Sequence, residues 1–367
     1  MKVTASGALL VVIFLIFLVC LFGARDYLLA AHVDGSAIYF SSDGPEYYRE
    51  YIKTYHSVDI FKTWEVFLRT SPILLMILTD GDLFPIQLFN LAIMFVAMRV
   101  ALSCLETFEG RIIFLASSLL FPYYVLGFLS LNKEVYAMCA ALFYASYMIR
   151  GRLLHLLLAF VLALTARYYM VASLLMLFVT VPRRGKPHWL MILGALLAIS
   201  VVAPIMKSLV PQYSSEGLLD SSGATAVLLD RIVSNYGYFL LYPFKYILLL
   251  VTRPYAFLSG STHDAIGAIV SLWSLAALGI VLWLWFSGQR LEPIVKRLIV
   301  AGLVAPIPMM WSEIMHWRYH SYVSFFFLFA ILLHLEKGWR GKQSAMAGRK
   351  TGQPVAGSMR VPGTSHP

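Results

Sequence analysis

Long apolar runs separated by short polar connections dominate the chain. A helix needs about 20 apolar residues to cross the hydrocarbon core of a bilayer. Runs of this kind predict ten membrane-spanning helices, at 7–24, 84–104, 111–129, 135–149, 152–166, 168–182, 188–206, 266–287, 297–312 and 321–335. No convincing small-x-small cleavage site follows the first run, so we expect an uncleaved first helix. The pattern therefore indicates an all-α fold, a polytopic membrane helix bundle over residues 1–340, with both termini on one side.

The short connections between these spans predict the orientation. Basic residues gather in alternate connections, which are cytoplasmic by the positive-inside rule. They include Arg111, Arg150, Arg152, Arg183, Arg184, Lys186, Arg290, Lys296 and Arg297. Residues 25–83 instead hold more acidic than basic residues and are expected to lie on the outer side. We predict a multi-pass membrane protein with both termini in the cytoplasm.

Two outer loops are expected to contain segments that do not cross the membrane. Residues 64–80 are fairly apolar, but a crossing there would invert every later connection, so we expect an interfacial helix in the first extracytoplasmic loop, 25–83. The same argument makes 236–251 an interfacial or re-entrant segment of a long extracytoplasmic loop, 207–265. Residues 341–367, rich in Gly, Ser, Lys and Pro, are expected to form a disordered basic cytoplasmic tail.

Composition supports a membrane protein and argues against other classes. The chain is 60% hydrophobic and 13% charged, with a mean hydropathy of +0.75, whereas soluble domains carry roughly 25% charged residues. The net charge of +10 is spread between apolar spans, so we expect contact with membrane lipids and no nucleic-acid partner. The chain has no Walker-type loop, Rossmann fingerprint, GxSxG elbow or CxxC pair, which weakens ATP-driven and hydrolase interpretations.

The first outer loop contains a polar and aromatic stretch, "SSDGPEYYREY", at 41–51. Gly44 and Pro45 make a turn after Asp43, and a helix can begin there with Pro near its first position. Asp43 then either caps that helix or accepts a proton from an attacking sugar hydroxyl at the membrane surface. Asp34 and Glu46 are alternative carboxylates for this role.

Other ionisable residues lie at the outer ends of different predicted spans, where such groups are costly and usually line a cavity. Lys133 and Glu134, in "LSLNKEVYA", either mark the membrane surface or hold an ammonium group against a phosphate. Arg167, in "LALTARYYMVAS", either reaches the headgroups beside interfacial tyrosines or clamps a phosphate.

The densest polar and aromatic cluster, "EIMHWRYHSY" at 313–322, joins the last two predicted spans. His316 and His320 have the i, i+4 spacing of a metal-binding pair on a helix, but Glu313 is the only acid nearby. We therefore favour anion binding by Arg318 and His320, and we predict no metal site.

The first span, the outer loop with "SSDGPEYY", the interfacial helix, "LNKE", "LTARYY" and "HWRYHSY" together resemble the GT-C glycosyltransferases, over roughly residues 1–335. Those multi-span enzymes use polyprenyl-phosphate-linked sugars at the outer membrane face. An acidic residue of their first outer loop serves as base or metal contact, and by position it corresponds to Asp43. Basic residues near the outer surface bind the lipid phosphate, which implies this role for Lys133, Arg167 and Arg318.

One departure from the family pattern leaves the base open. The paired-acid form of the loop motif is absent, because Gly44 follows Asp43, so Asp34 and Glu46 stay alternatives. Tyr47 and Tyr48 are expected to stack on a sugar ring. A Mg²⁺ or Mn²⁺ ion bridging the carboxylate and a phosphate is compatible with this scheme, although nothing in the spacing requires it.

The resemblance implies a membrane glycosyltransferase of polysaccharide biosynthesis in the cell envelope, located in the bacterial inner membrane. It would move a sugar from a polyprenyl-phosphate-linked donor to a glycan or lipid acceptor at the extracytoplasmic face. One alternative is a polymerase that transfers a whole repeat unit and uses the same arginines. Another is a lipid or glycan flippase, which should carry charged groups at the membrane midplane and show related halves. A third is a structural subunit of an envelope assembly.

Overall fold

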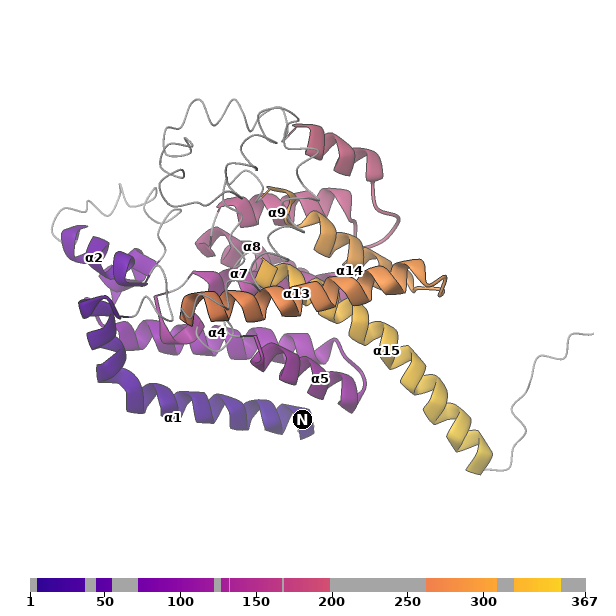
Figure 1. Ribbon diagram of the computed structural model, residues 1–367, viewed down its shortest axis with the longest axis horizontal. Helices are drawn as coiled ribbons and strands as arrows, with labels where there is room; N and C mark the ends of the chain where they lie inside the picture. The colour runs from indigo at the N-terminus through magenta and orange to yellow at the C-terminus, as the bar shows by residue number, and fades with distance from the viewer. Residues whose placement is uncertain are drawn as a thin grey trace, which may run out of the picture.

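The computed structural model describes residues 5–36, 44–54, 72–121, 127–131, 133–166, 168–198, 262–308 and 320–350. All regular secondary structure in these ranges is helical and they contain no strand, which confirms the all-α prediction (Figure 1). The named elements are α1 (Ala5–Asp34), α2 (Gly44–Thr54), α4 (Leu83–Ser103), α5 (Phe108–Leu119), η2 (Gly127–Leu129), α7 (Glu134–Arg150), α8 (Leu153–Ala166), α9 (Tyr168–Thr180), α13 (Thr262–Phe286), α14 (Pro293–Val304) and α15 (His320–Lys350).

Four helices in the described ranges are long and apolar enough to cross a membrane. They cover Ala5–Asp34, Leu83–Ser103, Gly267–Phe286 and Tyr322–Trp339. Each coincides with a span predicted from the sequence. The other predicted spans also fall on helices, but these are shorter: α5, α7, α8, α9, Trp189–Ala198 and α14. The chain is therefore an all-helical protein with several candidate membrane spans, and the number of ten crossings stays a prediction.

Helix α7 forms the centre of the bundle. It packs against α4, α8, α14 and α15, and its side chains are buried almost all round, from Glu134 to Ser146. A helix that is apolar on every face belongs in the interior. The small side chains of Ala137, Ala140, Ala141 and Ala145 let neighbouring helices approach closely.

The connections between helices collect at two opposite ends of α7. Around Arg150, at its C-terminal end, one cavity is lined by residues from several connections, among them Glu106, Arg184 and Glu292. Around its N-terminal end, Leu131 packs in a cluster with residues of α2 and α4. A helix of 17 residues is about 25 Å long. The structure thus places connections predicted as cytoplasmic at one end of α7, and the described parts of the first two predicted outer connections at the other. Which end faces the cytoplasm stays a prediction.

A buried carboxylate fixes the end of the bundle near Arg150. Glu336 of α15 is 0% exposed. Its Oε1 atom accepts hydrogen bonds from the backbone N–H of Glu106 (2.9 Å), from that of Thr107 (2.8 Å) and from the Thr107 hydroxyl (2.8 Å). The Thr107 Oγ1 in turn accepts from the Gly110 N–H and caps α5. The last helix is therefore tied to the link between α4 and α5.

Two helices extend well past the ends predicted for them. Helix α1 continues to Asp34, ten residues past the predicted end of the first span, and stops before Gly35, whose φ of +88° suits glycine. Helix α15 continues to Lys350, into the predicted disordered tail. Residues 341–350 contain Ala, Gln, Lys and Met, which favour helix, and the next proline is Pro354. In Figure 1, α15 projects well beyond the other helices.

Candidate functional site

The structure describes part of the predicted site. The side chains of Asp34, Tyr47, Tyr48, Lys133 and Glu134 are described. The predicted residues outside the described part of the chain are Asp43, Arg167, His316 and Arg318, together with the side chains of Glu46 in α2 and His320 in α15. The predicted interfacial segment 64–80 is described over 72–80, of which 72–78 is helical, and 236–251 lies outside. The expected convergence of distant charges therefore stays a prediction.

Lys133 and Tyr47, 86 residues apart in the sequence, meet at the N-terminal end of α7. The Lys133 Nζ lies 5.3 Å from the centroid of the Tyr47 ring, within the range of a cation–π contact. Lys133 is 9% exposed and Tyr47 is 7% exposed. The structure therefore brings together two residues that the sequence analysis assigned to one site.

The backbone before Lys133 is held in place by α4 and α7. The Gln87 Nε2 donates a hydrogen bond to the Leu129 carbonyl (2.8 Å), and the Asn90 Nδ2 donates to the Ser130 carbonyl (3.4 Å). The Tyr136 hydroxyl donates to the Asn90 Oδ1 at 2.6 Å. These buried amides hold the short segment that positions Lys133.

Gln87, Asn90 and Tyr136 were missed by the sequence analysis. The available signal was the presence of two amide side chains inside an otherwise apolar span, since such groups in membrane helices face protein partners rather than lipid.

Glu134 follows Lys133 in the first turn of α7 and is 1% exposed. A negative charge at a helix N-terminus interacts favourably with the helix dipole. The same dipole favours an anionic ligand there. A lysine and a glutamate are thus both buried at the start of this helix. If they only marked the membrane surface, we would expect their side chains to be exposed.

Helix α2 covers this end with tyrosines. Tyr47 and Tyr51 share one face at i, i+4 spacing and pack in a cluster that includes Met76, Leu83 and Leu131. Tyr48 is only partly buried, and its ring centroid lies 6.3 Å from that of Tyr51. A phenol ring thus stays accessible next to the buried pair.

Tyr51 packs tightly against Gly81. A Cβ added to Gly81 would lie 2.9 Å from the Tyr51 hydroxyl, and the φ of Gly81 is +81°. Burial, and then the negative charge of Asp80, raise the pKa of the Tyr51 phenol above its usual value. Ionisation of this phenol is therefore disfavoured further, and the positive φ together with the close tyrosine ring favours glycine at position 81.

The turn before α4 has the hydrogen bonds of a Schellman motif. The Gly81 N–H donates to the Met76 carbonyl (2.9 Å) and the Asp80 N–H to the Ile77 carbonyl (3.4 Å), with Asp80 at a φ of +53°. This arrangement ends the helix at 72–78. It also brings the chain directly to Asp82, where α4 begins.

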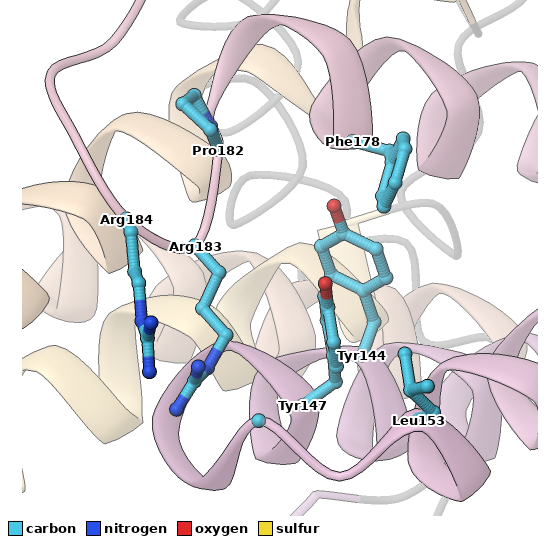
Figure 2. A pocket seen from close by; sticks show the side chains of 8 residues that line it. Tyr144, Tyr147, Leu153, Phe178, Pro182, Arg183 and Arg184 are labelled. Carbon is cyan, nitrogen blue, oxygen red and sulfur yellow. The ribbon is translucent and has the colours of Figure 1, made fainter.

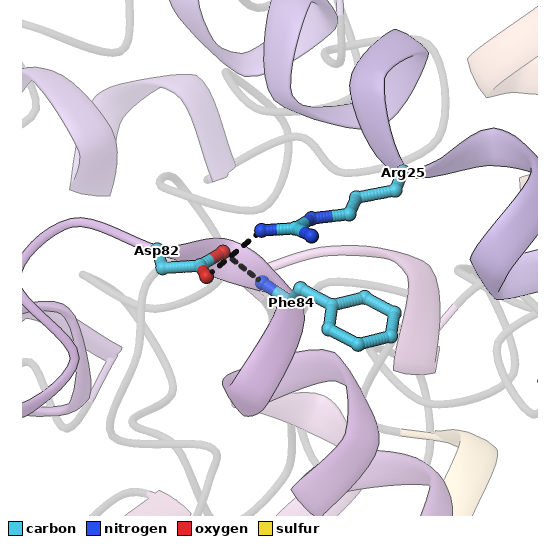
Figure 3. A network of polar contacts seen from close by, with 3 residues as sticks. All are labelled: Arg25, Asp82 and Phe84. Atoms are coloured by element: carbon cyan, nitrogen blue, oxygen red, sulfur yellow. Dashed lines mark hydrogen bonds and ion pairs between the residues drawn. The ribbon is translucent and has the colours of Figure 1, made fainter.

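Asp82 then links α4 to α1 (Figure 3). Its Oδ1 accepts from the Phe84 N–H at 2.9 Å and caps α4, while its Oδ2 pairs with the Arg25 guanidinium at 3.1 Å. The same guanidinium lies 5.0 Å from the centroid of the Phe84 ring. Arg25 and Asp82 are about half exposed, 52% and 42%, so we treat the link as a positioning contact at this end.

Asp34 has a local structural role. Its Oδ1 accepts a hydrogen bond from the Ser36 N–H at 2.7 Å, in an exposed turn at the end of α1. The contact closes a side-chain turn of the type common at helix ends. Among the described residues, no group of three or more His, Cys, Asp or Glu is placed to hold a metal ion.

Comparison with family models finds no match to this chain, and comparison with curated proteins and with solved structures finds no match either. The site is therefore interpreted from its own residues and geometry.

Proposed function

We propose that the chain is a membrane glycosyltransferase that moves a sugar from a polyprenyl-phosphate-linked donor to a glycan or lipid acceptor at the extracytoplasmic face. The observation that carries the proposal is the buried ammonium of Lys133, held at the N-terminus of α7 under the tyrosines of α2. A lysine and a helix N-terminus together form a favourable place for a phosphate. The leaving group of the proposed reaction is such a phosphate.

The proposed reaction has a simple balance of bonds and protons. The acceptor hydroxyl attacks the anomeric carbon of the sugar, a new glycosidic bond forms, and the bond from that carbon to the phosphate oxygen breaks. Asp43 takes the hydroxyl proton, with Asp34 and Glu46 as alternatives. Lys133, with Arg167 and Arg318, offsets the negative charge that develops on the departing phosphate.

Sequence order supports the assignment of Asp43. It directly precedes Gly44, the first residue of α2, so the chain keeps it close to the helix that holds Tyr47. The partly exposed Tyr48 ring suits stacking on a sugar.

The placement of buried charge favours an enzyme over a flippase. In the described ranges, the buried Lys, Arg, Asp and Glu residues are Lys133, Glu134 and Glu336. They lie at the two ends of the bundle, whereas a carrier is expected to hold such groups near mid-depth.

The test compares Asp43→Asn, Asp34→Asn and Glu46→Gln in cells that depend on the protein for an envelope glycan. Asp43→Asn is expected to abolish the glycan product at normal protein abundance, while Asp34→Asn, whose carboxylate closes an exposed turn, retains it. Loss of the product in the Asp34 or Glu46 variant alone would instead assign the base to that residue. A normal product level in the Asp43 variant would remove Asp43 from the site. Product length separates single-sugar transfer from polymerisation of repeat units.

Phosphate binding is tested separately with Arg167→Ala and Arg318→Ala in the purified protein. Both are expected to weaken capture of polyprenyl phosphate. Binding equal to that of the unchanged protein would contradict the phosphate role of these arginines.

A further inference from the structure

The end of the bundle opposite to the candidate site carries four arginines that the proposed transfer does not use. Arg150 ends α7, Arg183 and Arg184 follow α9, and Arg297 lies near the start of α14. All four line one cavity of about 450 Å³. We call these residues the arginine cluster.

The cavity has fewer negatively charged side chains than the arginine cluster has positive charges. Its acidic lining residues are Glu106 and Glu292, and Glu292 already pairs with Lys337 at 3.1 Å. The nearby Glu336 carboxylate is occupied by hydrogen bonds from Glu106 and Thr107. Four guanidinium groups therefore share a cavity with two carboxylates, one of which neutralises a lysine.

Two members of the cluster have a buried donor that lacks an acceptor. Within the described ranges, the Nε atoms of Arg183 and Arg297 are buried and have no hydrogen-bond partner. A guanidinium group has five N–H donors, and burying one without an acceptor is unfavourable. The positive charges of these two residues also act on each other unfavourably. An anion in the cavity would accept hydrogen bonds from these N–H groups and would offset the repulsion between the two guanidinium groups.

A second hollow of about 450 Å³ is lined by the same Arg183 and Arg184. Figure 2 shows the two guanidinium groups on one side of this hollow and the side chains of Tyr144, Tyr147, Leu153 and Phe178 on the other. Leu153 is 74% exposed and Phe178 is 47% exposed, so the apolar wall continues onto the outer surface of the bundle. The hollow is therefore cationic at one side and apolar at the other.

We propose that the arginine cluster binds the phosphate headgroup of an anionic membrane lipid, whose apolar part lies against Tyr147, Leu153 and Phe178. Arginine pairs with phosphate through two parallel hydrogen bonds, and basic pockets between membrane helices bind phosphate headgroups. The apolar wall is the feature that favours a lipid over a soluble phosphate. This site lies one length of α7, about 25 Å, from Lys133.

The test measures binding of phosphatidylglycerol to the purified full chain in neutral detergent by native mass spectrometry. Arg184→Gln and Arg297→Gln are each expected to weaken binding about tenfold, the usual effect of losing one charge-assisted contact. Arg184 is exposed, so its replacement is expected to leave the fold intact, which the melting temperature without lipid checks. Arg152→Gln is the matched control: Arg152 is exposed at the same end, lines neither hollow, and should stay within about twofold of the unchanged protein.

Two further comparisons decide the outcome. Glycerophosphoglycerol, the phosphodiester headgroup of phosphatidylglycerol without its acyl chains, is expected to bind at least about tenfold more weakly than phosphatidylglycerol, because it gains nothing from the apolar wall. Equal affinity would overturn the lipid assignment. An equal loss in the Arg152 and Arg184 variants, or no binding of phosphatidylglycerol by the unchanged protein, would overturn the site. Arg184→Gln is expected to leave sugar transfer unchanged, which keeps this result independent of the proposed transfer.

Discussion

The ammonium group of Lys133 lies 5.3 Å from the ring centroid of Tyr47. This contact joins the central helix α7 to helix α2 of the first loop, and both side chains are buried. Substitution of Lys133 therefore tests both the packing and the proposed chemistry at this end of the bundle.

Lys133→Gln removes the charge and keeps a side chain that reaches the same region. We expect sugar transfer to fall about a hundredfold, as when one group that stabilises a developing negative charge is lost. Transfer is measured as polyprenyl phosphate released per amount of folded protein. Lys53→Gln, which removes an exposed charge from α2, is the control and should transfer at the normal rate. Equal rates in both variants would assign Lys133 a structural role.

Glu336→Gln is expected to lower the free energy of unfolding by roughly 3 kcal/mol, because its Oε1 accepts three hydrogen bonds in a fully buried position. Glu292→Gln removes an ion pair whose side chains are 40% and 58% exposed and should cost less than about 1 kcal/mol. Reversible unfolding in mixed detergent measures both. A similar cost for the two variants would contradict the special role of Glu336.

Gly302→Ala tests the packing of α14 on α15. An added Cβ at Gly302 would contact the Phe327 ring, with Cδ1 at 2.7 Å and Cζ at 2.9 Å, and overpacking of this kind costs about 1–3 kcal/mol. Gly279 of α13 has no atom within 4 Å of an added Cβ. Gly279→Ala should therefore be neutral, or stabilising by up to about 1 kcal/mol from helix propensity. The melting temperature should fall for Gly302→Ala and should stay unchanged or rise for Gly279→Ala; a similar fall in both would contradict the packing argument.

Asp82→Ala and Asp82→Asn separate the two roles of Asp82. Asn still caps α4 but cannot pair ionically with Arg25, whereas Ala does neither. We expect Ala to cost about 1 kcal/mol through loss of the cap, and Asn to cost less than half of that because the ion pair is about half exposed. Equal destabilisation by the two variants would show that the ion pair, and not the cap, stabilises this end.

The apolar pattern located most of the described helices. Each predicted span overlaps a described helix. Among the described connections, several predicted as cytoplasmic and parts of two predicted as outer lie at opposite ends of α7, while the number of crossings and the orientation stay predictions. The predicted helix ends were less accurate. For example, α1 continues through 25–34, a stretch that contains neither Gly nor Pro, and ends before Gly35. The hydrophobic pattern indicates where a helix can form, whereas helix-breaking residues such as Gly and Pro determine where it ends.

Contacts between distant residues could not be predicted from the pattern. Glu336 and Thr107 are 229 residues apart, and nothing in either local sequence indicates the other. The sequence analysis named Lys133 and Tyr47 for one site because both were polar or aromatic near one membrane face. It missed Gln87 and Asn90, which hold the backbone just before Lys133. From the sequence alone, such amides look like ordinary members of a membrane span, because their hydrogen-bond partners lie far away in the sequence.

The contact of Glu336 with residues 106 and 107 also has a consequence for biosynthesis. The acceptor belongs to the last helix, whereas the donors leave the ribosome more than two hundred residues earlier. Until that helix emerges, these amide groups must be satisfied by water at the membrane surface. The bundle can therefore close at this end only after residue 336 has been synthesised and inserted.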